Sequence, residues 1–301
     1  MFHTPALNDD GLGGKPMKIT LSHTLTTALL VFQLSAASLQ GAKGAKIQTD
    51  ELIKRHVASI GTAEAIAAAR TRTMSGTVHL TLHLGDRGEL RGNAGVVSEK
   101  GKTRIGILFN SIQYPGDQLA FDGNDVTAGF VRPGLRTQFS RFIFAHGFLL
   151  EEGLLGGTTT TAWALLNVAE RRPKVKYTGV RKVEGKQRYE LSYRARKGAG
   201  DVQVWLYFDP ETFRHTASLY KLVRMANMAT EITESSYQRD SVYKIFEEFA
   251  DFREVDGLVL PYTYKITYSV EGEPTILQDW VISFTEVRHN TPPEPDIFVV
   301  R

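Results

Sequence analysis

Two histidines come closest to a metal-binding pattern in this sequence. His79 and His83 lie on one face of an alternating segment, with Thr81 between them. Strand geometry could bring both imidazoles to one metal ion. No third ligand stands at a fixed spacing, and a solvated polar face opposite Val78 and Leu80 explains the same pattern without a metal. The sequence therefore predicts no metal site.

Adjacent carboxylates and a glycine-rich loop are the other motifs that could carry chemistry. Glu247 and Glu248 are neighbours in a predicted strand, so their side chains point to opposite faces and cannot share a site. Gly153–Gly157 lacks the Lys-Ser/Thr ending and the preceding strand of a phosphate loop. The threonine run Thr158–Thr161 has no base in reach. We therefore expect no catalytic residue and no cofactor, and a protein that is not an enzyme.

The composition of the chain excludes further classes of function. The chain has 301 residues, of which 42% are apolar and 23% charged, with a formal net charge of +3. Acidic and basic residues are interleaved, so no stripe for nucleic acid is visible. The absence of cysteine excludes disulfides, thiolate zinc sites, cysteine nucleophiles and thioether lipid attachment.

The start of the chain has the order of a secretory signal peptide. Lys15 and Lys18 precede an apolar stretch from Ala28 to Leu34, and small residues follow. We expect residues 17–42 to be the signal peptide, Met17 to be the initiator, and residues 1–16 to be a non-native or misassigned extension. The alternative is a buried amphipathic helix. After cleavage an exported chain without cysteine would be soluble, with its folded domain at residues 49–301.

Two helices are predicted before the first strand. Thr49–Ile60 has a helical apolar period, with Thr49 or Asp50 as its cap and Gly61 at its end. Thr62 is expected to cap an alanine-rich helix, Ala63–Arg70. His56 falls near the apolar face of the first helix and is expected to be a hydrogen-bonded structural histidine.

Regular alternation then predicts a long antiparallel meander. It starts near Arg72, and hairpin turns recur, as at Gly85–Gly88 and at Glu184–Lys186. The residues between Asn227 and Tyr237 are polar and fit a loose loop or part of a strand. The expected fold is mainly β with helices (α+β), in one curved antiparallel sheet.

The middle of the chain interrupts this meander. Leu135–Ala169 is rich in apolar residues, and its spacing predicts two helices, Leu135–Leu150 and Ala162–Ala169, around a glycine-rich loop. This segment is either ordinary core packing or a mobile lid over an apolar cavity. The aromatic residues of the last two strands leave the same choice open, between sheet core and cavity wall.

Several short segments resemble the LolA/LolB-like outer-membrane lipoprotein-sorting superfamily. The similarity spans roughly residues 50–301, in matching order and spacing. The segments are Phe121–Gly123, Tyr177–Leu191, Leu206–Arg214, Phe249–Pro261, Val287–Asn290 and Asp296–Phe298.

The resemblance implies an incomplete barrel around a hydrophobic cavity, with the N-terminal helix and the helical insertion as a lid. It also implies a periplasmic carrier for the acyl chains of a lipid or lipoprotein, with an envelope protein as donor or acceptor and only transient membrane contact. The carrier has an arginine inside the barrel that bonds to the lid, and Arg72, Arg91 and Arg104 all lie near the early strands. The residues expected to line the cavity are Phe139, Phe142, Ile143, Leu149, Tyr264, Trp280 and Phe284.

A second interpretation keeps the fold and changes the function. An envelope sensor or protein-interaction module of this fold would have a small cavity and no transported ligand. Bound lipid would favour the carrier, whereas a ligand-free protein with a partner would favour the sensor. A third class, a hydrolase, would need catalytic residues that the sequence does not group.

Overall fold

The computed structural model describes residues 47–83, 88–225, 240–272 and 275–300. These ranges do not include the expected signal peptide at 17–42, the extension at 1–16 or the polar stretch at 227–237. Most of the turn at Gly85–Gly88 also lies outside them. All described residues belong to one unit, Gly44–Arg301.

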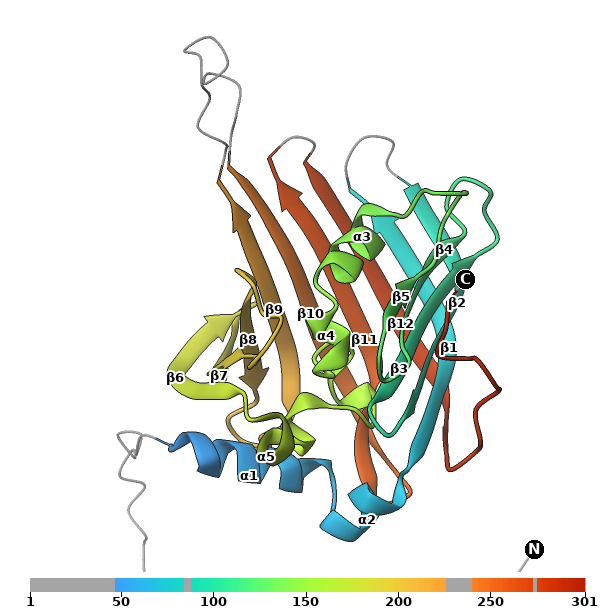
Figure 1. The fold of residues 1–301 in the computed structure, drawn as a ribbon. Helices are drawn as coiled ribbons and strands as arrows, with labels where there is room; N and C mark the ends of the chain where they lie inside the picture. The colour runs from blue at the N-terminus through green and yellow to red at the C-terminus, as the bar shows by residue number, and fades with distance from the viewer. Residues whose placement is uncertain (1–46, 84–87, 226–239, 273–274, 301) are drawn as a thin grey trace, which may run out of the picture. The chain divides into compact units, whose positions relative to one another are not determined.

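The strands form one antiparallel sheet of twelve strands in the order β5-β4-β3-β2-β1-β12-β11-β10-β9-β8-β7-β6 (Figure 1). The first and last strands therefore pair in the middle of the sheet. Among the described residues, the outer sides of β5 and β6 pair with no further strand, so the sheet curves without closing. This confirms the predicted fold class. The strands are β1 Thr71–Leu82, β2 Gly88–Glu99, β3 Lys102–Phe109, β4 Gly116–Phe121, β5 Val126–Ala128, β6 Lys174–Val183, β7 Lys186–Arg194, β8 Gln203–Phe208, β9 His215–Arg224, β10 Ser241–Val255, β11 Leu258–Glu271 and β12 Ile276–His289.

Alternation along the strands gives the sheet a dry concave face. On β11, Tyr264, Ile266 and Tyr268 are buried, and the residues between them are more accessible. On β12, Trp280 and Ile282 follow the same period. Because the side-chain period of a strand is two, these residues all point to one side and form the core there.

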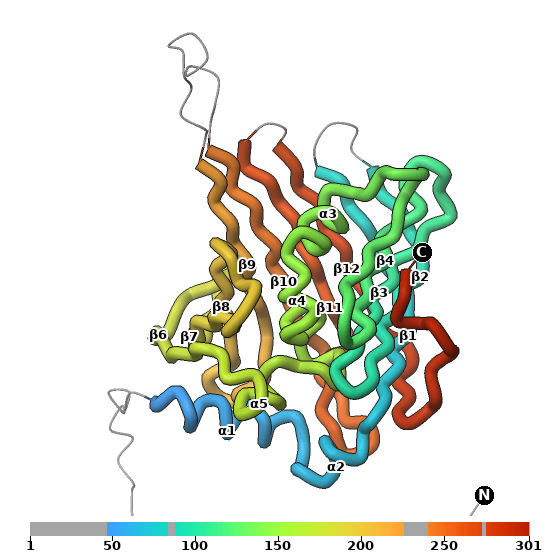
Figure 2. Tube along the Cα trace, viewed as in Figure 1, coloured from blue at the N-terminus to red at the C-terminus, as the bar shows by residue number. Residues whose placement is uncertain are grey.

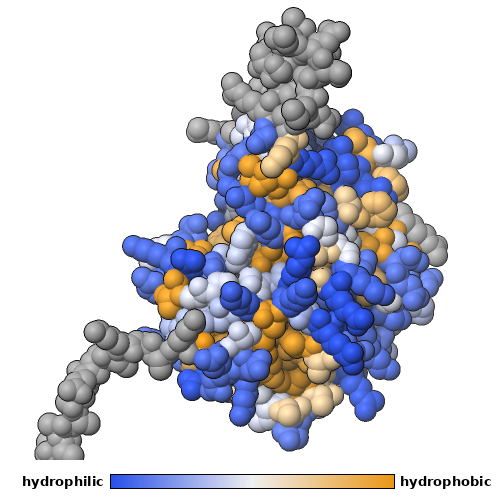
Figure 3. All heavy atoms as spheres, turned by 60° about the vertical axis from the view of Figure 1, so that its left-hand side comes forward, coloured by the Kyte–Doolittle hydropathy of each residue, from blue (hydrophilic) through white to orange (hydrophobic). Residues whose placement is uncertain are grey.

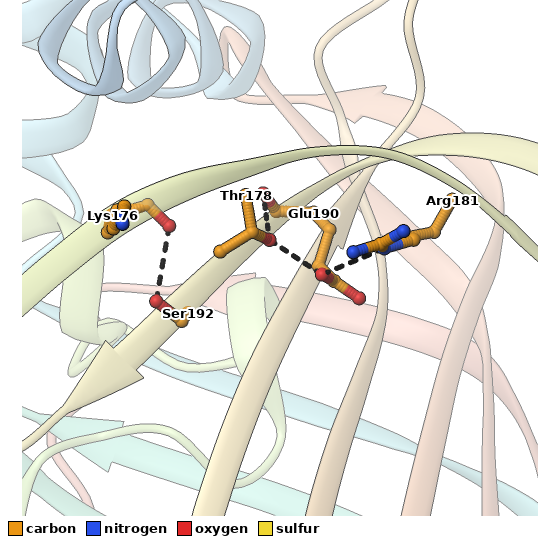
Figure 4. A network of polar contacts seen from close by, with 5 residues as sticks. All are labelled: Lys176, Thr178, Arg181, Glu190 and Ser192. Atoms are coloured by element: carbon orange, nitrogen blue, oxygen red, sulfur yellow. Dashed lines mark hydrogen bonds and ion pairs between the residues drawn. The ribbon is translucent and has the colours of Figure 1, made fainter.

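The two edge strands are protected in different ways. β5 has only three residues, and β6 has a charged surface and a bulge between Tyr177 and Gly179. Figure 4 shows the contacts at this bulge. The Thr178 hydroxyl donates to Glu190 Oε1 at 2.6 Å, and Arg181 Nε lies 3.3 Å from the same oxygen. Short, charged and bulged edges resist pairing with another chain.

Helices α1 (Thr49–Ile60) and α2 (Ala63–Ala68) precede β1. The predicted cap of α1 is wrong: Gln48 is the N-cap, and the Thr49 hydroxyl instead accepts a hydrogen bond from the backbone N–H of Tyr177 on β6, at 3.0 Å. The predicted cap of α2 is confirmed, because Thr62 Oγ1 accepts from Ala65 N at 3.2 Å. A Cβ at Gly61 would lie 2.6 Å from the carbonyl oxygen of Gly257, so glycine permits the close approach where α1 ends.

We call residues 135–169, in the middle of the chain, the lid segment. It contains the helices α3 (Gln138–Ala145), α4 (Phe148–Glu151) and α5 (Val168–Arg171), and the 3-10 turns η1 (Gly157–Thr159) and η2 (Ala164–Leu166). The predicted long helices are thus broken into short pieces. At Ala164 the reason is a non-local bond, because its N–H donates to Gly153 O at 3.2 Å.

The lid segment lies across the concave face of the sheet. Figures 1 and 2 show α3 and α4 in front of β10, β11 and β12, with α1 and α2 at the lower end. Figure 3 shows one surface of the molecule, mostly hydrophilic, with apolar side chains gathered in separate areas. In the described part of the chain, no helix has the length and hydrophobicity needed to cross a membrane.

Candidate functional site

The seven residues expected to line a cavity come together between the lid segment and the sheet. The ring of Phe139 on α3 lies 5.0 Å from that of Trp280 on β12 and 5.8 Å from that of Tyr268 on β11. Phe142, one turn further along α3, lies 6.2 Å from Tyr268. All seven are at most 6% exposed and belong to one hydrophobic cluster. They pack against other side chains of the same chain.

Several cavities adjoin the lid segment in the described structure, and two of them reach its buried side chains. One, of about 260 Å³, lies between α3 and β9–β11 and has Phe142 in its wall. The other, of about 40 Å³, lies between the helices α1 and α2 and the loop around Thr158. Apolar side chains of the lid segment are part of the hydrophobic core, including Leu154, Leu155 and Trp163, each at most 1% exposed.

Arg72 fastens the lower half of the lid segment to β1. Its guanidinium is 4% exposed, and Nη1 donates to the backbone carbonyl of Thr158 at 2.7 Å and to that of Thr160 at 3.4 Å. Nε lies 2.9 Å from His289 Nε2. Burial lowers the pKa of Arg72 to about 10, which leaves the side chain cationic at neutral pH.

Glu247 fastens the same loop to a different strand of the sheet, β10. This fully buried carboxylate on β10 accepts from the backbone N–H of Gly156 at 2.8 Å, from the Tyr220 hydroxyl at 2.6 Å and from the Tyr264 hydroxyl. Burial raises the pKa of Glu247 to about 7, against the opposing effect of these hydrogen bonds. The contact between loop and sheet thus contains a group that titrates near neutral pH.

Asp117 on β4 holds the start of α3. The buried carboxylate accepts from the hydroxyl of Ser140 at 2.6 Å and from the hydroxyls of Thr137 and Tyr114. Thr137 also caps α3, since its Oγ1 accepts from Ser140 N at 2.9 Å. Burial raises the pKa of Asp117 above its ordinary value, whereas the hydrogen bonds lower it.

Neutral groups complete the attachment of the lid segment. Trp163 Nε1 donates to His56 Nε2 at 2.8 Å, and His56 Nδ1 lies 3.0 Å from the carbonyl of Phe213. Burial lowers the pKa of His56 to about 4, so it is the neutral, hydrogen-bonded structural histidine that the sequence predicted. Thr161 bonds through its N–H to Ser98 Oγ at 2.8 Å.

Sequence reasoning named Arg72 without a role and missed Glu247 and Asp117 as buried groups. The sequence contains a signal for all three residues. Each lies at a position of its strand that alternation assigns to the buried, apolar face, which we call the apolar phase. Arg72 is in phase with Met74, Asp117 with Leu119 and Glu247 with Ile245. An ionised group in that phase must find partners inside the protein, and the lid segment supplies them here.

The other candidate groups lie apart from this site. His79 pairs with Glu89 at 3.2 Å and His83 with Asp279 at 3.0 Å, both at the surface. Across the described ranges, no group of three potential metal ligands occurs. Glu248 points away from Glu247 and pairs with Arg188 at 3.3 Å, which confirms that the two carboxylates share no site.

Similarity to known proteins is found among solved structures. A LolA superfamily protein from Nitrosomonas europaea is 11% identical over 84% of this chain and 98% of that one, with a TM-score of 0.45. A DUF1329 family protein from Desulfovibrio piger is 10% identical over 84% and 97%, with a TM-score of 0.39. A domain assigned to outer membrane lipoprotein sorting, from Vibrio parahaemolyticus, is 11% identical over 82% and 94%, with a TM-score of 0.39.

Neither a family model nor the sequence of a curated protein matches the chain. The chain has the architecture that the resemblance implied, an open, curved antiparallel sheet with helices on its concave face. The solved structures above have TM-scores below 0.5 and carry no argument about this chain.

Proposed function

We propose that this protein is an exported, non-enzymatic carrier that holds the acyl chains of a lipid or lipoprotein between the sheet and the lid segment. One observation carries this proposal. The lid segment fills the concave face with apolar side chains, yet it is fastened there by a few buried polar side chains, chiefly Arg72, Asp117 and Glu247. Such a layer can leave and return as a unit.

An acyl chain on the sheet would offset part of the cost of opening the lid segment. A twelve-carbon chain gains roughly 10 kcal/mol on burial, at about 0.8 kcal/mol per methylene. Against this gain stand the hydrogen bonds to charged groups, at about 1.5–3 kcal/mol each, and the exposure of the lid segment's own apolar side chains. The lid segment would therefore close again once the acyl chain has left.

The proposed cycle needs no cofactor and no reaction. The lid segment lifts, an acyl chain enters against Phe139, Trp280 and their neighbours, and the chain is passed to an acceptor in the envelope. The lid then closes on its own apolar side chains. The periplasm is the compartment that fits this cycle and the N-terminal signal expected from the sequence.

Native mass spectrometry of protein exported through its own leader, followed by lipid extraction, tests the proposal. A bound acyl lipid that co-purifies, or an acyl probe that binds the purified protein, supports the carrier. A ligand-free mass together with no binding of an acyl probe would overturn it.

A second candidate, a sensor or protein-interaction module, is favoured by the filled concave face. Trp163 and Leu149 are fully buried there, so the closed form is complete without a guest. Purification of the chain from its envelope would then recover a specific partner protein and no extractable lipid.

A further inference from the structure

The cavity between α3 and strands β9–β11 differs from the core in its chemistry. It lies at the upper end of the concave face, between α3 on one side and β9, β10 and β11 on the other, with a volume of about 260 Å³. Arg141 and His146 come from the α3 side, and Arg224 comes from β9. Two cationic side chains thus face one cavity from opposite walls.

No carboxylate stands among the described residues that line this cavity. Burial raises the pKa of the Tyr268 hydroxyl, and the charges of Arg141 and Arg224 act in the opposite direction, which places both guanidinium groups within electrostatic reach of the same wall residue. The sequence around α3 also lacks acidic residues. Residues 126–150 contain Arg132, Arg136 and Arg141 but no Asp or Glu.

The hydrogen-bonding groups at the cavity are mainly donors. His146 Nε2 is buried and has no hydrogen-bond partner within the described structure. Burial, together with the charge of Arg224, lowers the pKa of His146, so the ring is neutral and one tautomer presents Nε2–H as a donor. Two guanidinium groups, this imidazole and the amide of Gln138 match an oxyanion, such as phosphate or carboxylate.

The cavity borders the apolar core. Its wall includes Phe142, whose ring lies 6.0 Å from that of Tyr243 and 6.2 Å from that of Tyr268. Behind this wall lie Phe139 and Trp280, where the acyl chain is proposed to bind. A ligand with an anionic headgroup and an apolar chain would therefore place the headgroup against the arginines and the chain against the aromatic residues.

We propose that Arg141 and Arg224 bind the anionic headgroup of an amphiphile whose acyl chain lies beneath the lid segment. This inference rests on the proposed function and adds the class of ligand. The guanidinium groups hold the phosphate or carboxylate at the mouth, and the chain extends inward past Phe142.

Titration of the full-length protein with two ligands of one acyl length tests the inference. The probes are myristoyl lysophosphatidylglycerol, which is anionic, and monomyristoylglycerol, which is uncharged, with inorganic phosphate as a third, chain-free probe. We expect the anionic lipid to bind about tenfold more tightly than the uncharged one. The double variant Arg141→Gln/Arg224→Gln should lose this preference and keep its affinity for monomyristoylglycerol.

Arg132→Gln is the matched control, because Arg132 is exposed, lies just before α3 and is not in the cavity wall. The Arg132→Gln variant should keep the preference for the anionic lipid. Thermal unfolding at the wild-type temperature would show that both variant proteins fold. Equal affinities for the two lipids, or a preference that survives in the double variant, would overturn the headgroup site while leaving the carrier intact.

The remaining outcomes separate the two proposals. Inorganic phosphate that binds as tightly as the anionic lipid would identify a site for free anions and reject the lipid headgroup. If neither lipid binds, the carrier and the headgroup site both fail.

Discussion

The guanidinium of Arg72 donates to the carbonyl of Thr158 at 2.7 Å, across 86 residues of sequence. This contact distinguishes Arg72 from the two other arginines of the early strands. Arg91 is exposed, and Arg104 lies in the opposite phase of β3, where it donates to Ile297 O at 2.8 Å. Among these three arginines, Arg72 is therefore the one whose guanidinium bonds to the lid segment.

Replacing Arg72 with Met should loosen the lid segment. The variant keeps the apolar stem but leaves the carbonyls of Thr158 and Thr160 without their donor, which costs about 1–3 kcal/mol. We expect faster amide hydrogen exchange in residues 156–161 and a lower free energy of unfolding. Arg91→Met is the matched control and should stay within about 0.5 kcal/mol of the wild type. Unchanged exchange in Arg72→Met would show that the contact does not hold the lid.

The sheet could be predicted because its signals are local. Glu184 and Gly185 have positive φ angles of 47° and 77°, and Asp256 and Gly257 of 51° and 75°, which is the turn chemistry expected between paired strands. Alternation then decides which face of each strand is dry. The pairing of β1 with β12, which brings Arg72 opposite His289, has no such local signal, because it joins distant parts of the chain.

The lid segment could be predicted only in outline because distant partners determine its backbone. Gly156 N bonds to Glu247 on β10, and Thr158 O accepts from Arg72 on β1. Apolar spacing in residues 162–169 suggested a helix, but these external bonds and the pairing of Ala164 with Gly153 favour turns. Polar residues in the apolar phase of a strand are the clue that sequence reasoning can use for such sites.

Glu247 should make folding stability depend on pH. Because its pKa is raised from 4.5 to about 7, the folded state binds this proton more tightly than the unfolded state. The resulting stabilisation is fully present below pH 4.5 and is lost as the pH rises to about 7. Its size is about 3 kcal/mol, since each tenfold change in proton affinity is worth about 1.4 kcal/mol.

The variant Glu247→Gln isolates this contribution. His56 acts in the opposite direction, because its pKa is lowered from 6.5 to about 4 and its neutral form gains stability as the pH rises through that window. The wild type and the variant share this effect of His56. It therefore cancels in the difference between their free energies of unfolding, measured with urea between pH 4 and 8. The variant should gain about 3 kcal/mol relative to the wild type over that range, and parallel pH profiles would contradict the prediction.

The bulge on the edge strand β6 should depend on Thr178. Its hydroxyl donates to the mostly buried Glu190, so Thr178→Val removes a partner from a carboxylate that water reaches poorly. We expect a loss of about 1–3 kcal/mol in the free energy of unfolding. Ser192→Ala, which removes only the bond to the Lys176 carbonyl, should cost less than about 1 kcal/mol. Equal effects of the two changes would mean that Glu190 does not anchor the bulge (Figure 4).

A disulfide between the lid segment and β2 should block acyl binding. Ser98 Oγ and Thr161 Oγ1 lie 3.1 Å apart, so cysteines at these positions are close enough to pair, and the chain has no other cysteine. Oxidised Ser98→Cys/Thr161→Cys should bind a fluorescent acyl probe at least about tenfold more weakly than its reduced form, because the binding-competent open state becomes rare. Ser98→Cys alone controls for the lost hydrogen bond and should not respond to reductant. If the oxidised protein binds the probe as well and as fast as the reduced protein, the guest does not enter by lifting this part of the lid.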